Sequence, residues 1–174
     1  MSPMKVAGNG QGKILTPDEL RRLFTDGLRS PRDRALFGIC LFTGCRVSEA
    51  LALQTTDIKS ETLTFRKSTT KGKLKTRVVD IQPGLAQLLA EYHPVKKGAL
   101  FPGMRGRSVT LTRFAADKIL KNACDRVGLV GVIPLGNEHE QKNRFQNAAC
   151  NSASRMKSNE VNDWTCCALN CSSS

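Results

Sequence analysis

The stretch of sequence that decides the fold is Thr43-Gly44-Cys45-Arg46-Val47-Ser48-Glu49-Ala50-Leu51, because it breaks one apolar helix and opens another. Arg46 and Glu49 are three residues apart, so they lie on the same side of the second helix. A guanidinium group is planar and permanently charged, and it matches two phosphate oxygens at once. Glu49 can accept from that group and hold its orientation. The stretch therefore predicts a buried phosphate site.

Two helix-start signals precede this stretch. Thr16 and Glu19 have the spacing of a capping box, with Pro17 at the first helical position. Ser30-Pro31 repeats the signal before a run that is apolar over most of its circumference, as a central core helix would be. Gly27 is expected to end the first helix in a left-handed conformation. The predicted helices cover residues 17–26, 31–42 and 46–53.

The hydrophobic pattern then changes to a period of two. Residues 61–66 and 76–81 alternate and contain β-branched side chains, so they are expected to pair as strands across the turn at residues 69–75. A short strand near residues 57–58 would complete a three-stranded antiparallel meander.

Two more helices are predicted after the strands, at residues 83–92 and 111–127, with a basic loop at residues 105–107 between them. Gly128 is expected to end the second of these helices. One side of that helix is predicted to face the core through Phe114, Ala115, Ile119, Ala123 and Val127.

The charge of the chain indicates a polyanionic partner. The formal net charge is +12, and residues 1–132 carry 23 Lys and Arg against 11 Asp and Glu, whereas residues 133–174 carry four of each. Because no transmembrane or amphipathic run accompanies this charge, nucleic acid is a better partner than a membrane. The polar start of the chain lacks the apolar core of a signal peptide, so a cytoplasmic location is expected. Three cysteines in apolar helical contexts are expected to be reduced core residues: Cys40, Cys45 and Cys124.

The order of these elements resembles the N-terminal half of the catalytic domain of the tyrosine recombinases, the phage-integrase family, over residues 14–132. The resemblance implies that Arg46 clamps the scissile phosphate and stabilises the charge of the transition state, with Glu49 in support. It also implies that a lysine of the turn at residues 69–77 protonates the leaving 5′-hydroxyl. Lys71 matches this general acid best and Lys73 is the alternative. The competing interpretations are a solvated Arg46–Glu49 pair and a solvated basic hairpin.

The remaining basic residues of this segment would contact the DNA backbone, which positions a protein without reading sequence. The expected contacts are Lys73, Lys75, Arg77, Arg105, Arg107 and Arg113. Duplex DNA is thus the expected partner, with other recombinase protomers as a second class of partner.

The last part of the sequence departs from the family pattern. His139 is followed three residues later by Lys142 where the family has arginine, and no tyrosine follows Trp164. Tyr92, the only tyrosine, lies in a leucine-rich helix where, with His93, it is expected to be a packing residue. No nucleophile is therefore assigned, and cleavage by this chain alone is not expected. The cysteines of residues 150–171 have poor spacing for zinc, so neither a metal nor a cofactor is expected.

The sequence thus predicts an α+β fold that is mainly helical, with helices around a small three-stranded antiparallel sheet. Residues 1–13 would be a flexible leader, residues 14–132 a partial integrase-like catalytic domain, and residues 133–174 a disordered or frameshifted tail. The predicted function is that of a truncated DNA-binding site-specific recombinase or integrase that does not cleave by itself. The alternatives are a non-catalytic DNA-binding or assembly module, and a basic helical transcriptional regulator with a helix-turn-helix in place of the meander.

Overall fold

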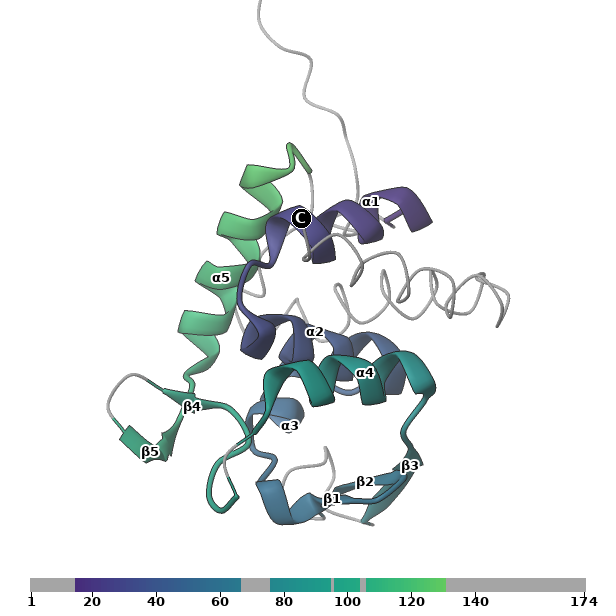
Figure 1. The fold of residues 1–174 in the computed structure, drawn as a ribbon. Helices are drawn as coiled ribbons and strands as arrows, with labels where there is room; N and C mark the ends of the chain where they lie inside the picture. The colour runs from purple at the N-terminus through teal and green to yellow at the C-terminus, as the bar shows by residue number, and fades with distance from the viewer. Residues whose placement is uncertain (1–14, 67–75, 95, 104–105, 131–174) are drawn as a thin grey trace, which may run out of the picture.

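The computed structural model describes residues 15–66, 76–94, 96–103 and 106–130, with the backbone alone for residues 106–109 (Figure 1). Helices predominate, and a three-stranded antiparallel sheet lies at the opposite end of the molecule from α1. The predicted α+β class is confirmed. No helix within the described ranges is both long and apolar enough to span a membrane.

The first helical segment confirms the predicted start and corrects the predicted end. α1 (Pro17–Arg22) is capped by Thr16, whose hydroxyl accepts from the Glu19 amide while the Glu19 carboxylate accepts from the Thr16 amide. The helix continues as the π-helical turn η1 (Leu23–Gly27). Gly27 is not left-handed, contrary to the prediction. A Cβ atom there would lie 2.9 Å from the carbonyl oxygen of Ala123, so this glycine permits close helix packing.

The centre of the molecule is a pair of helices, α2 (Pro31–Thr43) and α4 (Pro83–Tyr92), which lie side by side (Figure 1). Gly38 of α2 faces Leu88 of α4 so closely that a Cβ atom would lie 2.6 Å from a Leu88 methyl carbon. α2 ends at Gly44, which is left-handed as a glycine after a helix commonly is.

α3 (Val47–Leu51) is shorter than the predicted helix. The chain becomes extended after Ala52 and pairs with residues 99–100. The Leu100 amide donates to the Leu53 carbonyl at 2.9 Å, and Gln54 forms an antiparallel bridge with Ala99. This long-range pairing ends α3 early. The 3₁₀ turn η2 (Thr55–Asp57) then leads to the sheet.

The predicted meander is confirmed. β1 (Ile58–Lys59), β2 (Thr62–Phe65) and β3 (Arg77–Asp80) form one antiparallel sheet in chain order, with Leu63 opposite Val79 and Phe65 opposite Arg77. The regulator alternative required a helix-turn-helix here and is therefore disfavoured. The predicted turn at residues 69–75 lies outside the described residues, as do the leader at 1–13 and the tail at 133–174.

The segment before the last helix differs from the prediction of a basic loop. β4 (Pro102–Gly103) and β5 (Gly106–Thr110) pair as a second, two-stranded sheet, so that Arg107 lies in a strand. α5 (Arg113–Arg126) follows, capped by the Thr112 hydroxyl and ended at left-handed Gly128 as predicted.

The predicted buried face of α5 is wrong in part. Phe114 is 80% exposed, whereas Leu120 is 1% exposed. The residues of α5 and its end that are buried in the core are Ala116, Leu120, Ala123, Cys124 and Val127. α5 packs against η1, and that contact places Leu120, rather than Phe114, toward the core.

Candidate nucleic-acid interface

The turn between α2 and α3 fixes the position of Arg46. The hydroxyl of Thr43 donates to the Ile39 carbonyl (2.7 Å) and accepts from the Cys45 amide (3.3 Å), while the Gly44 amide donates to the Cys40 carbonyl (3.1 Å). These bonds hold the chain as it leaves α2. Arg46 is consequently the N-cap residue of α3, with an extended backbone.

Glu49 lies in the first turn of α3 and contacts Arg46 in two ways. Its Oε2 atom accepts from the Arg46 amide at 2.9 Å, and its Oε1 atom lies 3.8 Å from Nη1 of the Arg46 guanidinium. The Glu49 side chain is 9% exposed and that of Arg46 is 30% exposed. A carboxylate in the first turn is also favoured by the helix dipole. The pair predicted from the sequence is therefore present, with the carboxylate inside and the guanidinium at the surface.

Arg77 reaches the same carboxylate from the sheet. Its Nη2 atom lies 4.0 Å from Oε2 of Glu49, and its guanidinium lies over the ring of Phe65, 4.6 Å from the centroid. The sequence predicts Arg77 only as one of several contacts to the DNA backbone, and the link to Glu49 is an addition from the structure. The alternation of β3 is the sequence feature that could have indicated this link. Arg77 and the partly buried Val79 are two residues apart, so they share the face of β3 that packs on the core.

Of the other predicted site residues, the structure describes Arg113 and the backbone of Arg107. Arg113 begins α5, and Arg107 lies in β5, where its side chain is outside the described residues. Four of them lie outside the described residues altogether: Lys71, Lys73, Lys75 and Arg105. Their roles stay predictions.

Several arginines that contribute to the +12 charge serve the fold. Arg22 donates to the Val127 carbonyl and Arg126 donates to the Gly27 carbonyl, each at 2.7 Å, which ties the first helical segment to α5. Arg34 of α2 pairs with Glu91 of α4. The basic surface open to a polyanion is therefore smaller than the net charge suggests.

Tyr92 is a packing residue, as predicted. Its hydroxyl donates to the Leu100 carbonyl at 2.9 Å, and its ring stacks on Phe101 with centroids 5.8 Å apart. Burial raises the pKa of this hydroxyl. His93 differs from the prediction, because it is exposed and adopts a left-handed backbone at the end of α4.

The three cysteines Cys40, Cys45 and Cys124 are buried free thiols, as predicted. A hydrogen bond with the Cys40 side chain is the main cause that lowers the pKa of the Cys45 thiol, and burial opposes it. No group of three or more potential metal ligands occurs among the side chains that the structure describes.

Comparison with known proteins identifies the family to which this architecture belongs. The model of the phage integrase family matches residues 13–159. The chain belongs to the phage integrase family. The match extends past Val132, where the sequence pattern predicts the end of the family-like segment, so the division of the chain at that point stays a prediction.

Curated members of the family are similar to part of the chain. A putative integrase/recombinase of Sinorhizobium fredii, y4qK, is 37% identical over 100 residues, which are 56% of this chain and 32% of that protein. A tyrosine recombinase XerC of Roseiflexus castenholzii is 31% identical over 136 residues, which are 70% of this chain and 43% of that protein. The chain thus spans less than half the length of each of these relatives.

Proposed function

We propose that this chain binds duplex DNA and supplies the phosphate-holding part of a site-specific tyrosine recombinase. The observation that carries the proposal is the surface guanidinium of Arg46, held at the start of α3 by the buried carboxylate of Glu49. Membership of the phage integrase family supports it, as do relatives named integrase/recombinase and tyrosine recombinase.

In this proposal Arg46 binds the scissile phosphate and stabilises the negative charge that develops in phosphoryl transfer. Preorganisation matters here, because a guanidinium that is already oriented loses little entropy on binding. Lys71 acts as the general acid, with Lys73 as the alternative. The other predicted basic residues bind neighbouring phosphates.

By itself this chain is proposed to hold a phosphate without cutting the strand. Tyr92 is the only tyrosine of the sequence, and its hydroxyl donates to the Leu100 carbonyl. A raised pKa also opposes the ionisation that a nucleophile needs. The same observation favours the second candidate function, a non-catalytic module that occupies recombination sites together with other protomers.

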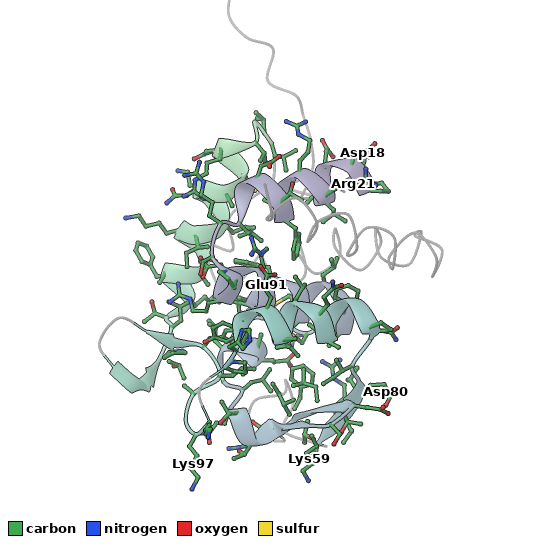
Figure 2. All side chains as sticks on the ribbon, in the orientation of Figure 1. Asp18, Arg21, Lys59, Asp80, Glu91 and Lys97 are labelled. Atoms are coloured by element: carbon green, nitrogen blue, oxygen red, sulfur yellow. The ribbon has the colours of Figure 1, made fainter. Side chains whose placement is uncertain are left out.

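The binding proposal is tested by gel shift of a duplex at several salt concentrations. Arg46→Ala should weaken binding markedly, whereas Lys59→Ala removes an equal charge from an exposed residue of β1 and should have a small effect (Figure 2). With roughly five phosphates neutralised, log affinity should fall with log salt at a slope of about −4 to −5. Binding that is insensitive to salt and to Arg46→Ala would refute the proposal.

The absence of cleavage is tested separately with a nicked suicide substrate. The chain should form no protein–DNA adduct that survives denaturation. An adduct that persists would contradict the non-cleaving proposal, and its loss in Tyr92→Phe would identify the residue responsible.

A further inference from the structure

Two arginines from distant elements converge on Glu49. Arg46 lies at the start of α3 and Arg77 lies on β3, yet a nitrogen of each guanidinium is within 4.0 Å of an oxygen of the one carboxylate. Such ion pairs are longer than charge-assisted hydrogen bonds, which measure about 2.7–2.9 Å. Within the described part of the chain, the short bond to the Glu49 carboxylate comes from the backbone amide of Arg46. Glu49 therefore orients both guanidinium groups without occupying their donors closely.

Arg77 keeps donors that solvent can reach. Its guanidinium carbon lies over the Phe65 ring, 4.6 Å from the centroid, and a guanidinium carries five N–H donors. The side chain is 42% exposed, and that of Arg46 is 30% exposed. Both cations can thus be reached from solvent while the carboxylate between them is buried.

The charge of the cluster suits a single phosphodiester. Two guanidinium groups and one carboxylate carry a net charge of +1, which one phosphodiester anion neutralises. The same carboxylate limits the separation of the two guanidinium groups, so an anion with two oxygen atoms available can contact both. Basic residues that follow the DNA backbone independently have no such shared partner.

We propose that Arg77 binds the same DNA phosphate as Arg46, and that Glu49 aligns the two arginines as a clamp. The inference rests on the proposed function and deepens it. It separates Arg77 from the residues that contact neighbouring phosphates. In this proposal Arg46 and Arg77, both in the described part of the chain, hold one phosphate together.

The test is a double-mutant cycle on duplex DNA, measured by fluorescence anisotropy over a range of salt concentrations. The variants are Arg46→Ala, Arg77→Ala and the double variant. Each single change should weaken binding on the order of tenfold, and the double variant should bind within about threefold of the weaker single variant, because residues that share one partner are not additive. The salt slope of the double variant should differ from that of the unaltered chain by about 0.9, the value for one phosphate.

The matched control is Arg66→Ala. Arg66 follows β2, is 43% exposed, and donates through Nε to the buried carboxylate of Asp57 at 2.8 Å, so it resembles Arg77 in exposure and pairing but does not reach Glu49. Its loss should be additive with Arg46→Ala. Arg77→Lys guards against misfolding, because it keeps the charge: its salt slope should match that of the unaltered chain while its affinity falls, since lysine lacks the planar fork.

Additive effects of Arg46→Ala and Arg77→Ala, with a slope change near 1.8 in the double variant, would mean two separate phosphates and would overturn the shared clamp. An Arg77→Ala variant that binds as well as the unaltered chain would also overturn it. Failure of the unaltered chain to bind any duplex is a different result, because it refutes the proposed function from which this inference starts.

Discussion

The Oε2 atom of Glu49 lies 2.9 Å from the backbone nitrogen of Arg46 and accepts its hydrogen bond at the start of α3. The bond is one half of a capping box. The other half is unavailable, because a guanidinium has donors only, whereas N-cap residues are usually Ser, Thr, Asp or Asn. α3 therefore begins with a residue unsuited to capping, and Glu49 offsets part of that cost while it orients the guanidinium.

Replacement of Glu49 should separate these two contributions. In Glu49→Gln the amide oxygen can still accept from the Arg46 amide, so the free energy of unfolding should fall by about 1 kcal/mol or less. Glu49→Ala should cost about 2 kcal/mol, because a part-buried amide loses its acceptor and two guanidinium groups lose their counter-charge. Urea denaturation measures both, and equal losses in the two variants would contradict the capping role.

A second buried carboxylate, Asp57, supports the sheet. Its Oδ2 atom accepts from the Gln54 amide at 2.9 Å, and its Oδ1 atom accepts from Nε of Arg66 at 2.8 Å. Asp57→Ala should lower the free energy of unfolding by about 2 kcal/mol. Asp18→Ala is the control, because Asp18 forms an exposed ion pair with Arg21 on α1 and should change stability by about 0.5 kcal/mol or less (Figure 2). Similar losses of unfolding free energy in Asp57→Ala and Asp18→Ala would show that burial does not strengthen the Asp57–Arg66 pair.

The two sides of α5 should respond differently to truncation. Leu120→Ala removes a buried side chain from the core and should cost about 2–5 kcal/mol. Phe114→Ala removes a larger side chain that is exposed, and the free energy of unfolding should change by about 0.5 kcal/mol or less. Thermal or urea unfolding would distinguish them. A large loss of unfolding free energy in Phe114→Ala would show that Phe114 is buried, as the sequence pattern predicts.

These cases show which features could be predicted from the sequence. The Thr16–Glu19 capping box and the helix ends at Gly44 and Gly128 depend on residues within a few positions of one another, and all of them are found as predicted. The strand order of the meander also follows, because its strands are consecutive and alternate clearly.

Features that depend on distant parts of the chain were not predictable in this way. The buried face of α5 is decided by contact with η1, about a hundred positions earlier, and hydrophobicity alone placed Phe114 inside. The Arg77–Glu49 link joins a strand to a helix, and no local pattern gives the distance between them. The Arg46–Glu49 pair was predictable because both residues lie in one helical turn.

Gly27 should be intolerant of any side chain, although it is not left-handed. A Cβ atom would lie 2.9 Å from a backbone oxygen of α5, and backbone can move aside only if the helices separate. Gly27→Ala should therefore lower the free energy of unfolding by about 1–3 kcal/mol. In Gly38→Ala the close neighbour is a flexible methyl group of Leu88, and alanine has the better helix propensity, so the loss should be smaller. A larger loss in Gly38→Ala than in Gly27→Ala would show that the tighter contact is the one between α2 and α4.

Cys124 should make stability depend on pH in alkaline solution. Burial, and then the negative charge of Asp125, raises the pKa of this thiol from about 9 to about 11. Between these values the unfolded chain has lost the proton and the folded chain has kept it, so the free energy of unfolding falls as pH rises, by at most about 1.4 kcal/mol per pH unit. Below pH 9 the thiol is protonated in both states and contributes no slope.

Cys124→Ala isolates this contribution from that of the other ionisable groups of the chain. The variant loses some stability at pH 7 because a buried group is removed, but its deficit relative to the unaltered chain should shrink as the pH rises from 9 to 11. Urea denaturation at each pH measures this difference. A deficit that stays constant from pH 7 to pH 11 would show that the Cys124 thiol titrates alike in the folded and unfolded states.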